Sequence, residues 1–348
     1  MKAMIMAAGV GSRLMPLTLD RPKPMMPMCN RPLMEITVDL LFQYGIKDII
    51  CNLYHQGEWI TSYFDTDARY KGYICYSSET ELLGTAGGVK RCEWFLDDTF
   101  VVVSGDALTD VDLPRLIRSH QRQGALATIA VKPVEAVEEF GVVISDHNGK
   151  IVSFQEKPSR EGALSNYANS GIYIFEPEIF TCIPAEQFYD FGRQVFPELV
   201  RIQAPFYADP IDNYWCDIGN LETYRQAHYD ILNNLVNIEP AGQLQKIGSS
   251  NVLRGDNSYL HPDITLCGQV IIGNNCHIAA GAVLDNCVIW DHTVVGPNSH
   301  LKSCVVGDNC LIGSNCRIGE GAVVASRCRL EDGFRLGPLE KALPAKGL

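Results

Sequence analysis

A six-residue repeat runs through the last quarter of the chain. One aliphatic residue recurs every six positions, with two steps of five, at Leu260, Leu266, Ile272, Ile278, Leu284, Ile289, Val295, Leu301, Val306, Ile312, Ile318, Val324, Leu330 and Leu336. A hexapeptide period is typical of a parallel β-helix, whose coils stack one on the next. The repeat therefore predicts a solenoid over residues 259–338.

A second column of small residues accompanies the aliphatic one. Two positions before each aliphatic residue stand mostly small side chains, among them Cys276, Cys287, Cys304, Cys310, Cys316 and Cys328. Residues i and i−2 of a strand point to the same side, so both columns should face the interior, with Cys287 beside Cys304. The chain has 13 cysteines, an odd number, and no CxxC spacing. We therefore interpret these six as small buried residues.

Before the repeat, the chain alternates short apolar runs with helical stretches. Strands are expected at residues 3–8, 48–53, 72–76, 100–104 and 126–131, and helices at 33–44, 58–64, 85–95 and 113–123. This order is typical of an α/β fold with a Rossmann-like, mostly parallel sheet, which binds ligands beyond the carboxyl ends of its strands. The predicted organisation is an α/β domain at 1–232, a linker at 233–258, the β-helix at 259–338 and a tail at 339–348.

A glycine-rich loop, Gly9-Val10-Gly11-Ser12-Arg13, follows the first predicted strand, and Lys23 comes later in the sequence. Glycines let backbone N–H groups face an anion, and the two cations would add fixed positive charge. A P-loop requires a Lys-Ser or Lys-Thr pair, which does not follow here. The dinucleotide fingerprint requires a third glycine where Leu14 stands. The loop therefore indicates a polyphosphate-binding surface of another kind.

Composition narrows the class of protein further. With 46% hydrophobic and 20% charged residues, the chain resembles ordinary globular proteins. No segment reaches the roughly 18 apolar residues of a membrane span, and the apolar run at the start is too short for a signal peptide. We therefore expect a cytoplasmic protein without a membrane partner. The net charge of −12 at pH 7 argues against a nucleic-acid partner, which requires a basic surface.

The motif at the start of the chain extends beyond the glycine-rich loop. G-x-G-S-R-L-x-P-L-T followed by R-P-K-P-M resembles the signature of the sugar-1-phosphate nucleotidylyltransferases, with Ser12 in place of the usual threonine. Four more segments resemble that family in the correct order: LLGTAGGV at 82–89, SGDALTD at 104–110, FQEKP at 154–158 and YWCDIGNLETY at 214–224. The resemblance covers essentially the whole chain. It implies a left-handed β-helix that supports association into a homo-oligomer.

The resemblance also implies roles for individual residues. The substrates would be a nucleoside triphosphate and a sugar 1-phosphate, and the products a nucleotide sugar and pyrophosphate. The catalytic residues would be Arg13, Lys23, Asp106 and Asp217. Asp106 and Asp217 would also bind Mg²⁺. The nucleotide would contact Ala8, Gly9, Gly11, Ser12, Glu79, Gly84, Thr85 and Gly87. The sugar phosphate would contact Gly141, Glu156, Lys157 and Asn169. Because the reaction joins two anions, electrostatic stabilisation should dominate it.

The choice of substrates rests on the segment ETELLGTAGG. It is most similar to E-x-E-P-L-G-T-A-G of the mannose-1-phosphate guanylyltransferases, although Leu82 replaces the proline. A carboxylate such as Glu79 could accept hydrogen bonds from N1–H and the 2-amino group of guanine. The expected substrates are therefore GTP and mannose 1-phosphate. A glucose or heptose phosphate with UTP, dTTP, CTP or ATP is the alternative. A non-catalytic subunit that senses nucleotide sugars is a further alternative. An acyltransferase site in the β-helix is disfavoured, because no long loop interrupts the repeat.

Overall fold

The computed structural model describes residues 1–344 and divides into two compact units. The first, which we call the α/β unit, comprises Met1–Val10 and Thr37–Asp217. The second, the β-helix unit, comprises Gly11–Ile36 and the residues from Ile218 onward. The units therefore differ from the predicted domains, because the segment from Gly11 to Ile36 groups with the C-terminal half of the chain.

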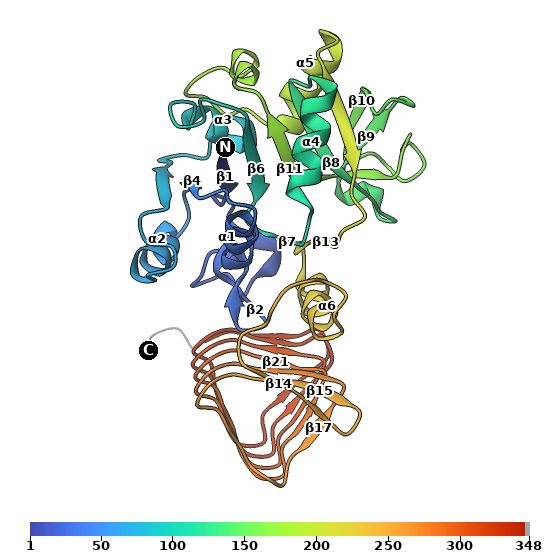
Figure 1. The fold of residues 1–348 in the computed structure, drawn as a ribbon. Coiled ribbons are helices and arrows are strands. Elements are labelled where there is room, and N and C mark those ends of the chain that lie inside the picture. The colour runs from blue at the N-terminus through green and yellow to red at the C-terminus, as the bar shows by residue number, and fades with distance from the viewer. Residues whose placement is uncertain (345–348) are drawn as a thin grey trace. The chain divides into compact units, whose positions relative to one another are not determined.

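The α/β unit is built on a nine-stranded sheet (Figure 1). One half consists of parallel strands: β1 (Lys2–Met6), β4 (Asp48–Leu53), β5 (Ile74–Ser78) and β6 (Phe100–Ser104). The other half consists of β8 (Ala127–Pro133), β9 (Gly141–Ser145), β10 (Ile151–Glu156), β11 (Tyr167–Phe175) and β12 (Phe206–Pro210). The long strand β11 runs antiparallel to both β6 and β8 and so joins the two halves. The predicted α/β class is confirmed, and the antiparallel strands are an addition to it.

Helices connect the strands: α1 (Leu33–Gln43), α2 (Gly57–Thr66), α3 (Gly84–Arg91), α4 (Leu113–Gln123) and α5 (Phe196–Arg201). Helix α4 has its predicted bounds because the sequence supplies both caps. Asp112 accepts a hydrogen bond from the Arg115 amide, and Gly124 adopts the left-handed conformation at φ 54°. Helix α3 ends at Arg91, earlier than predicted, and turns follow it. In the described part of the chain, no helix combines the length and apolar character needed to cross a membrane.

The β-helix unit contains a stack of coils, whose strands β14 to β30 form three sheets of mainly parallel strands (Figure 1). The predicted aliphatic column lies in register through the stack: Ile272 pairs with Ile289, Ile289 with Val306, and Val306 with Val324. All four of these side chains are buried. The predicted solenoid is therefore confirmed, down to the residues that fill its interior.

The solenoid is longer at both ends than the repeat predicts. Part of the predicted linker forms β14 (Gln243–Ile247) and β15 (Ser250–Arg254), and β15 pairs with β18 (Gln269–Ile272). The repeat hides this coil because Arg254 occupies the position of the aliphatic residue, opposite Ile272. Part of the predicted tail forms β30 (Lys341–Ala342), which pairs with β27 (Val323–Val324). The rest of the predicted tail, from residue 345, lies outside the described residues.

The six cysteines of the second column are buried, as predicted. The sulfur atoms of Cys287 and Cys304 lie 3.8 Å apart. Several members of the column also donate to a main-chain carbonyl: Cys310 Sγ lies 3.1 Å from the Ala325 oxygen, and Thr293 Oγ1 lies 2.8 Å from the Gly307 oxygen. The column therefore accommodates small side chains, and several of them donate a hydrogen bond to the main chain.

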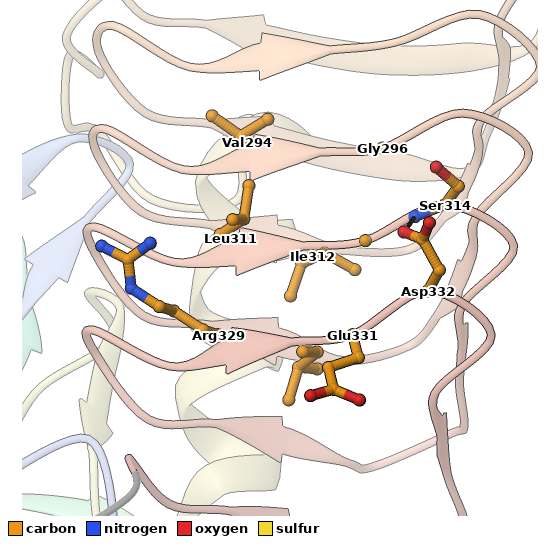
Figure 2. Close-up of a pocket in the computed structure, with 10 residues that line it drawn as sticks. Val294, Gly296, Leu311, Ile312, Ser314, Arg329, Glu331 and Asp332 are labelled. Carbon is orange, nitrogen blue, oxygen red and sulfur yellow. Dashed lines mark hydrogen bonds between the residues drawn. The ribbon is translucent and has the colours of Figure 1, made fainter.

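Two faces of the solenoid differ in exposure. On the seven-stranded sheet, the outward-facing Ile271, Val288 and Val305 are buried. On the sheet that runs from β16 (Tyr259–Leu260) to β28 (Arg329–Leu330), a shallow pocket is open to solvent. Figure 2 shows this pocket, which is lined by residues that include Val294, Leu311, Ser314, Arg329 and Asp332. The seven-stranded sheet is thus the face that packs against the rest of its own unit.

Candidate active site

The two predicted metal-binding carboxylates come from neighbouring positions of a small ladder. Strand β7 (Ala107–Thr109) begins directly after Asp106, and strand β13 (Trp215–Asp217) ends at Asp217. The two strands pair antiparallel, with Asp217 opposite Ala107. Ser104 Oγ donates a hydrogen bond of 2.5 Å to Asp106 Oδ1. The ladder therefore gives Asp106 and Asp217 neighbouring backbone positions, although they belong to separate sequence motifs.

A pair of carboxylates fits Mg²⁺, a hard cation that prefers oxygen ligands and keeps several waters and substrate phosphates in its shell. Both aspartates are half-buried, which leaves them accessible to a ligand. Among the described residues, no group of three or more His, Cys, Asp and Glu side chains could hold a metal ion by itself. A cation at Asp106 and Asp217 would therefore take its remaining ligands from water and substrate.

Gly11 of the glycine-rich loop contacts residues that follow the loop in the sequence. Gly11 adopts the left-handed conformation at φ 66°, and its carbonyl accepts a hydrogen bond of 2.9 Å from Thr18 Oγ1. A Cβ atom added to Gly11 would lie 3.0 Å from Cβ of Lys23, so the two residues pack together. Lys23 is largely buried, whereas Arg13 and Ser12 are exposed. Within the β-helix unit, the structure therefore brings Gly11 and Lys23 into contact.

Glu79 belongs to a buried hydrogen-bond network in the α/β unit. Its side chain is 7% exposed, and its two oxygens accept hydrogen bonds from Asn52 Nδ2, at 2.7 Å, and from the Leu83 amide, at 3.0 Å. Asn52 Oδ1 in turn accepts a hydrogen bond of 2.9 Å from the Ala7 amide, just before the predicted nucleotide-binding residues Ala8 and Gly9. This network therefore connects the ends of β1 and β4 with the start of α3.

Sequence reasoning missed Asn52. The signal was available, because Asn52 is the one polar residue among the buried positions of β4. A polar side chain at the carboxyl end of a buried parallel strand needs a partner. That partner is Glu79, 27 positions later in the chain.

Two glycines of the 82–89 segment, Gly84 and Gly87, face protein backbone. A Cβ atom on Gly84 would lie 2.5 Å from the Tyr189 carbonyl oxygen, and one on Gly87 would lie 2.7 Å from the Gln187 carbonyl oxygen. Thr85 Oγ1 donates to Asp190 Oδ2 at 2.9 Å. The small size of these residues therefore lets the backbone of residues 187–190 pack closely against them. Their contact with a nucleotide stays a prediction.

The predicted sugar-phosphate residues lie on β9, β10 and β11. Gly141 pairs with Glu156, and a Cβ atom on Gly141 would lie 3.1 Å from Glu156 Oε2. Lys157 follows at φ 46°, and its amide donates to the Phe140 carbonyl at 3.1 Å. Asn169 Nδ2 donates to the Tyr173 hydroxyl at 3.0 Å. The structure thus joins Gly141, Glu156 and Lys157 in one corner of the sheet.

Asp190 links this corner to the 82–89 segment. Partial desolvation raises the pKa of the Glu156 carboxyl above its ordinary value, and the negative charge of Asp190 raises this pKa further. The positive charges of Lys157 and Arg193 oppose the shift. The same Asp190 accepts the hydrogen bond from Thr85. Sequence reasoning missed Asp190, since only the fold brings it near both groups.

The predicted site residues are divided between the units. Gly11, Ser12, Arg13 and Lys23 belong to the β-helix unit. The α/β unit holds Ala8, Gly9, Glu79, Gly84, Thr85, Gly87, Asp106, Gly141, Glu156, Lys157, Asn169 and Asp217. The first group contains the cations of the glycine-rich loop, and the second contains both carboxylates predicted to bind metal.

The sequence matches two family models. Residues 2–234 match the nucleotidyl transferase family, and residues 242–336 match the EIF2B subunit epsilon LbH domain, a left-handed β-helix. The chain is 41% identical to the UTP–glucose-1-phosphate uridylyltransferase of Synechocystis sp., over 84% of each chain. It is 34% identical to the mannose-1-phosphate guanylyltransferase catalytic subunit beta of Drosophila melanogaster, over 63% of this chain and 59% of the relative.

Two shorter proteins match about two thirds of the chain over almost their whole length. The D-glycero-alpha-D-manno-heptose 1-phosphate guanylyltransferase of Aneurinibacillus thermoaerophilus is 34% identical over 66% of this chain and 98% of its own. The crystal structure of HddC from Yersinia pseudotuberculosis superposes with a TM-score of 0.58 and 27% identity, over 66% of this chain and 99% of that one. Sequence motifs, fold and family models agree, and the chain belongs to the nucleotidyl transferase family.

Proposed function

We propose that the protein transfers a nucleotidyl group from a nucleoside triphosphate to a sugar 1-phosphate. An oxygen of the sugar phosphate forms a bond to the α-phosphorus, the bond from that phosphorus to the bridging oxygen breaks, and pyrophosphate leaves. The observation that supports this proposal is the β7–β13 ladder, in which Asp217 pairs with Ala107, the residue after Asp106, in a chain of this family. Mg²⁺ bound there would neutralise phosphate charge.

The remaining roles follow from charge. Arg13 and Lys23 would bind the triphosphate, and Lys157 would bind the sugar phosphate, so that two anions can approach each other. Glu156 and Asn169 would bind sugar hydroxyls. Glu79 would act on the nucleotide indirectly, through the backbone that it holds. Association of subunits through the β-helix stays a prediction.

We propose UTP and glucose 1-phosphate as the substrates. Similarity to the uridylyltransferase extends over 84% of both chains. In addition, Glu79 is buried and both of its oxygens accept hydrogen bonds from protein donors, which weakens the argument for guanine. GTP and mannose 1-phosphate form the second candidate pair, because several relatives at 29–34% identity are guanylyltransferases.

Pyrophosphate release in the presence of Mg²⁺ tests the proposal. We would cross UTP, GTP, dTTP, CTP and ATP with glucose 1-phosphate and mannose 1-phosphate, with EDTA as the control. Release confined to UTP and glucose 1-phosphate, and abolished by EDTA, is the expected result. Release confined to GTP and mannose 1-phosphate would replace the substrates and keep the reaction. Nucleotide-sugar binding without release from any pair would identify a sensing subunit instead.

The raised pKa of Glu156 predicts a pH effect. The carboxyl holds its proton to a higher pH than an ordinary glutamate, so kcat/KM for the sugar phosphate should fall on acidification at a pH above about 4.3, the ordinary value. Asp190→Asn removes a negative charge that raises this pKa. We therefore expect the acid limb of the pH–rate profile to move to lower pH in this variant. Glu178→Gln, at an exposed carboxylate, is the control and should leave the limb in place.

A further inference from the structure

The segment from Gly11 to Ile36 has little regular structure of its own. Before helix α1 begins at Leu33, it contains two single 3₁₀ turns, Ser12–Leu14 and Lys23–Met25, and the two-residue strands β2 (Pro27–Met28) and β3 (Arg31–Pro32). Many of its side chains are nevertheless buried. Since it belongs to the β-helix unit, the coils it packs against help to determine the conformation around Arg13 and Lys23.

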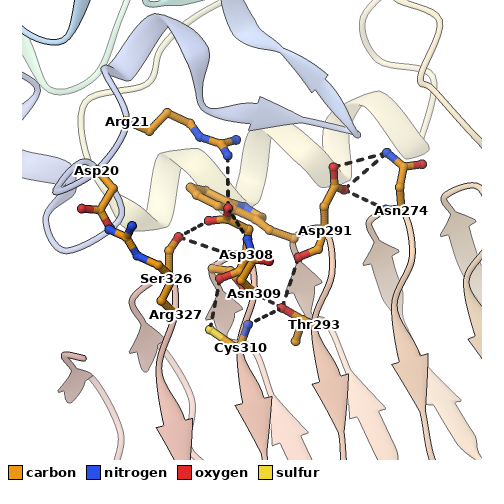
Figure 3. Close-up of polar contacts among 12 residues, drawn as sticks. Asp20, Arg21, Asn274, Asp291, Thr293, Asp308, Asn309, Cys310, Ser326 and Arg327 are labelled. Atoms are coloured by element: carbon orange, nitrogen blue, oxygen red, sulfur yellow. Dashed lines mark hydrogen bonds and ion pairs between the residues drawn. The ribbon is translucent and has the colours of Figure 1, made fainter. Parts of the chain in front are cut away.

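Three coils of the β-helix contact this segment through charged side chains. Arg21 Nη2 lies 3.4 Å from Asp308 Oδ2, and Asp20 Oδ2 lies 2.5 Å from the Arg327 guanidinium. Lys341 Nζ donates to the Met15 carbonyl at 2.7 Å. Figure 3 shows the first two contacts, with Asp20 and Arg21 above the coil corners that carry Arg327 and Asp308. The segment is thus held at both sides of Leu17 and Thr18.

The Arg21–Asp308 pair is the more enclosed of the two ion pairs. Its side chains are 18% and 19% exposed, against 39% for Asp20 and 63% for Arg327. Ser326 Oγ donates to Asp308 Oδ1, so the carboxylate is fixed by the next coil. Screening by water is weaker for a pair of this kind than for a surface pair. We therefore regard Asp308 as the main anchor.

Trp290 completes the anchor from the other side. The Arg21 guanidinium lies 5.3 Å from the centre of the Trp290 ring, within range of a cation–π interaction. Trp290 Nε1 donates to the Tyr224 hydroxyl at 3.0 Å, and this hydroxyl donates to the Pro27 carbonyl. The same side chains therefore hold the segment at Arg21 and again at Pro27.

The anchored residue is close to Lys23 in the chain. Only Pro22 separates them, and its ring fixes φ at −69°. Lys23 packs against Gly11, so the position of Arg21 is transmitted through Lys23 to the middle of the glycine-rich loop. We propose that Asp308 of the β-helix, through Arg21, is a positioning residue that sets the affinity of this loop for the nucleoside triphosphate. This inference rests on the proposed function.

The test compares Asp308→Asn with Glu320→Gln. Glu320 pairs with Lys302 at 3.6 Å, in the same β-helix but with both side chains more than 60% exposed. We expect Asp308→Asn to raise KM for the nucleotide about tenfold, since small displacements of binding groups can cost up to about 100-fold. KM for the sugar phosphate and the melting temperature should change little, and Glu320→Gln should behave as wild type. The exchanged pair, Arg21→Asp with Asp308→Arg, should regain part of the lost affinity.

Hydrogen exchange in the absence of substrate provides a second readout. Amides of residues 11–27 should exchange faster in Asp308→Asn than in Glu320→Gln, because the anchor is lost in the former alone. An unchanged nucleotide KM, or unchanged exchange over 11–27, would overturn the positioning role. A wild-type protein without activity on any substrate pair would refute the proposed function, and the exchange experiment would then decide on the anchor alone.

Discussion

Asp106→Asn is expected to lower nucleotidyl transfer by about 10²–10³-fold, the loss typical when one preorganised electrostatic group is removed. The substitution keeps the shape of the side chain and its bond to Ser104, but it removes the negative charge that a magnesium ligand needs. The melting temperature should stay near that of wild type, since Asp106 is half-buried and lies at the edge of the β7–β13 ladder. Pyrophosphate release at several Mg²⁺ concentrations measures the effect.

Asp110→Asn is the matched control. Asp110 follows the same short strand β7, and its carboxylate accepts a hydrogen bond of 2.8 Å from the Tyr214 amide, which asparagine can also accept. This variant should retain most of the activity. Equal losses in Asp106→Asn and Asp110→Asn would mean that the ladder as a whole matters, and that Asp106 has no separate role with the metal.

The β-helix could be predicted from the sequence almost residue by residue. Its interior repeats the same environment every six positions, so the period alone predicts which aliphatic residues face inward. The prediction missed the coils where the pattern loses its aliphatic residue, at Arg254 in the first coil and at Ala342 in the last. It was also wrong for Phe334, a residue of the second column that is 38% exposed. A local pattern thus predicts a fold well when the contacts that bury it repeat along the chain.

The site was predicted less evenly, because its contacts do not repeat. The motifs led to Asp106 and Asp217, and the fold then placed Asp217 on β13 opposite Ala107, the residue that follows Asp106. Asn52 and Asp190 were missed, since each acquires its role from a partner far away in the chain: Asn52 from Glu79, and Asp190 from Glu156 and Thr85. Likewise, no sequence pattern indicates that the segment after Gly11 groups with the β-helix.

Glu79→Ala is expected to lower the free energy of unfolding by about 2–6 kcal/mol, because it leaves two buried donors without partners at about 1–3 kcal/mol each. The donors are Asn52 Nδ2 and the Leu83 amide. Both residues are buried, and a Cβ atom on Gly88 would lie 2.8 Å from Asn52 Nδ2, so the surroundings of this amide are closely packed. Urea unfolding followed by circular dichroism measures the change.

Glu81→Ala is the matched control, because Glu81 is a glutamate of the same segment but is exposed. Its unfolding free energy should stay within about 0.5 kcal/mol of wild type, as for most surface substitutions. The two readings of Glu79 make opposite predictions. A residue that reads guanine would change the ratio of GTP to UTP turnover and leave stability intact. A residue that holds the start of α3 would lower stability, and lower turnover with every nucleotide alike, because the backbone that meets the base is no longer fixed.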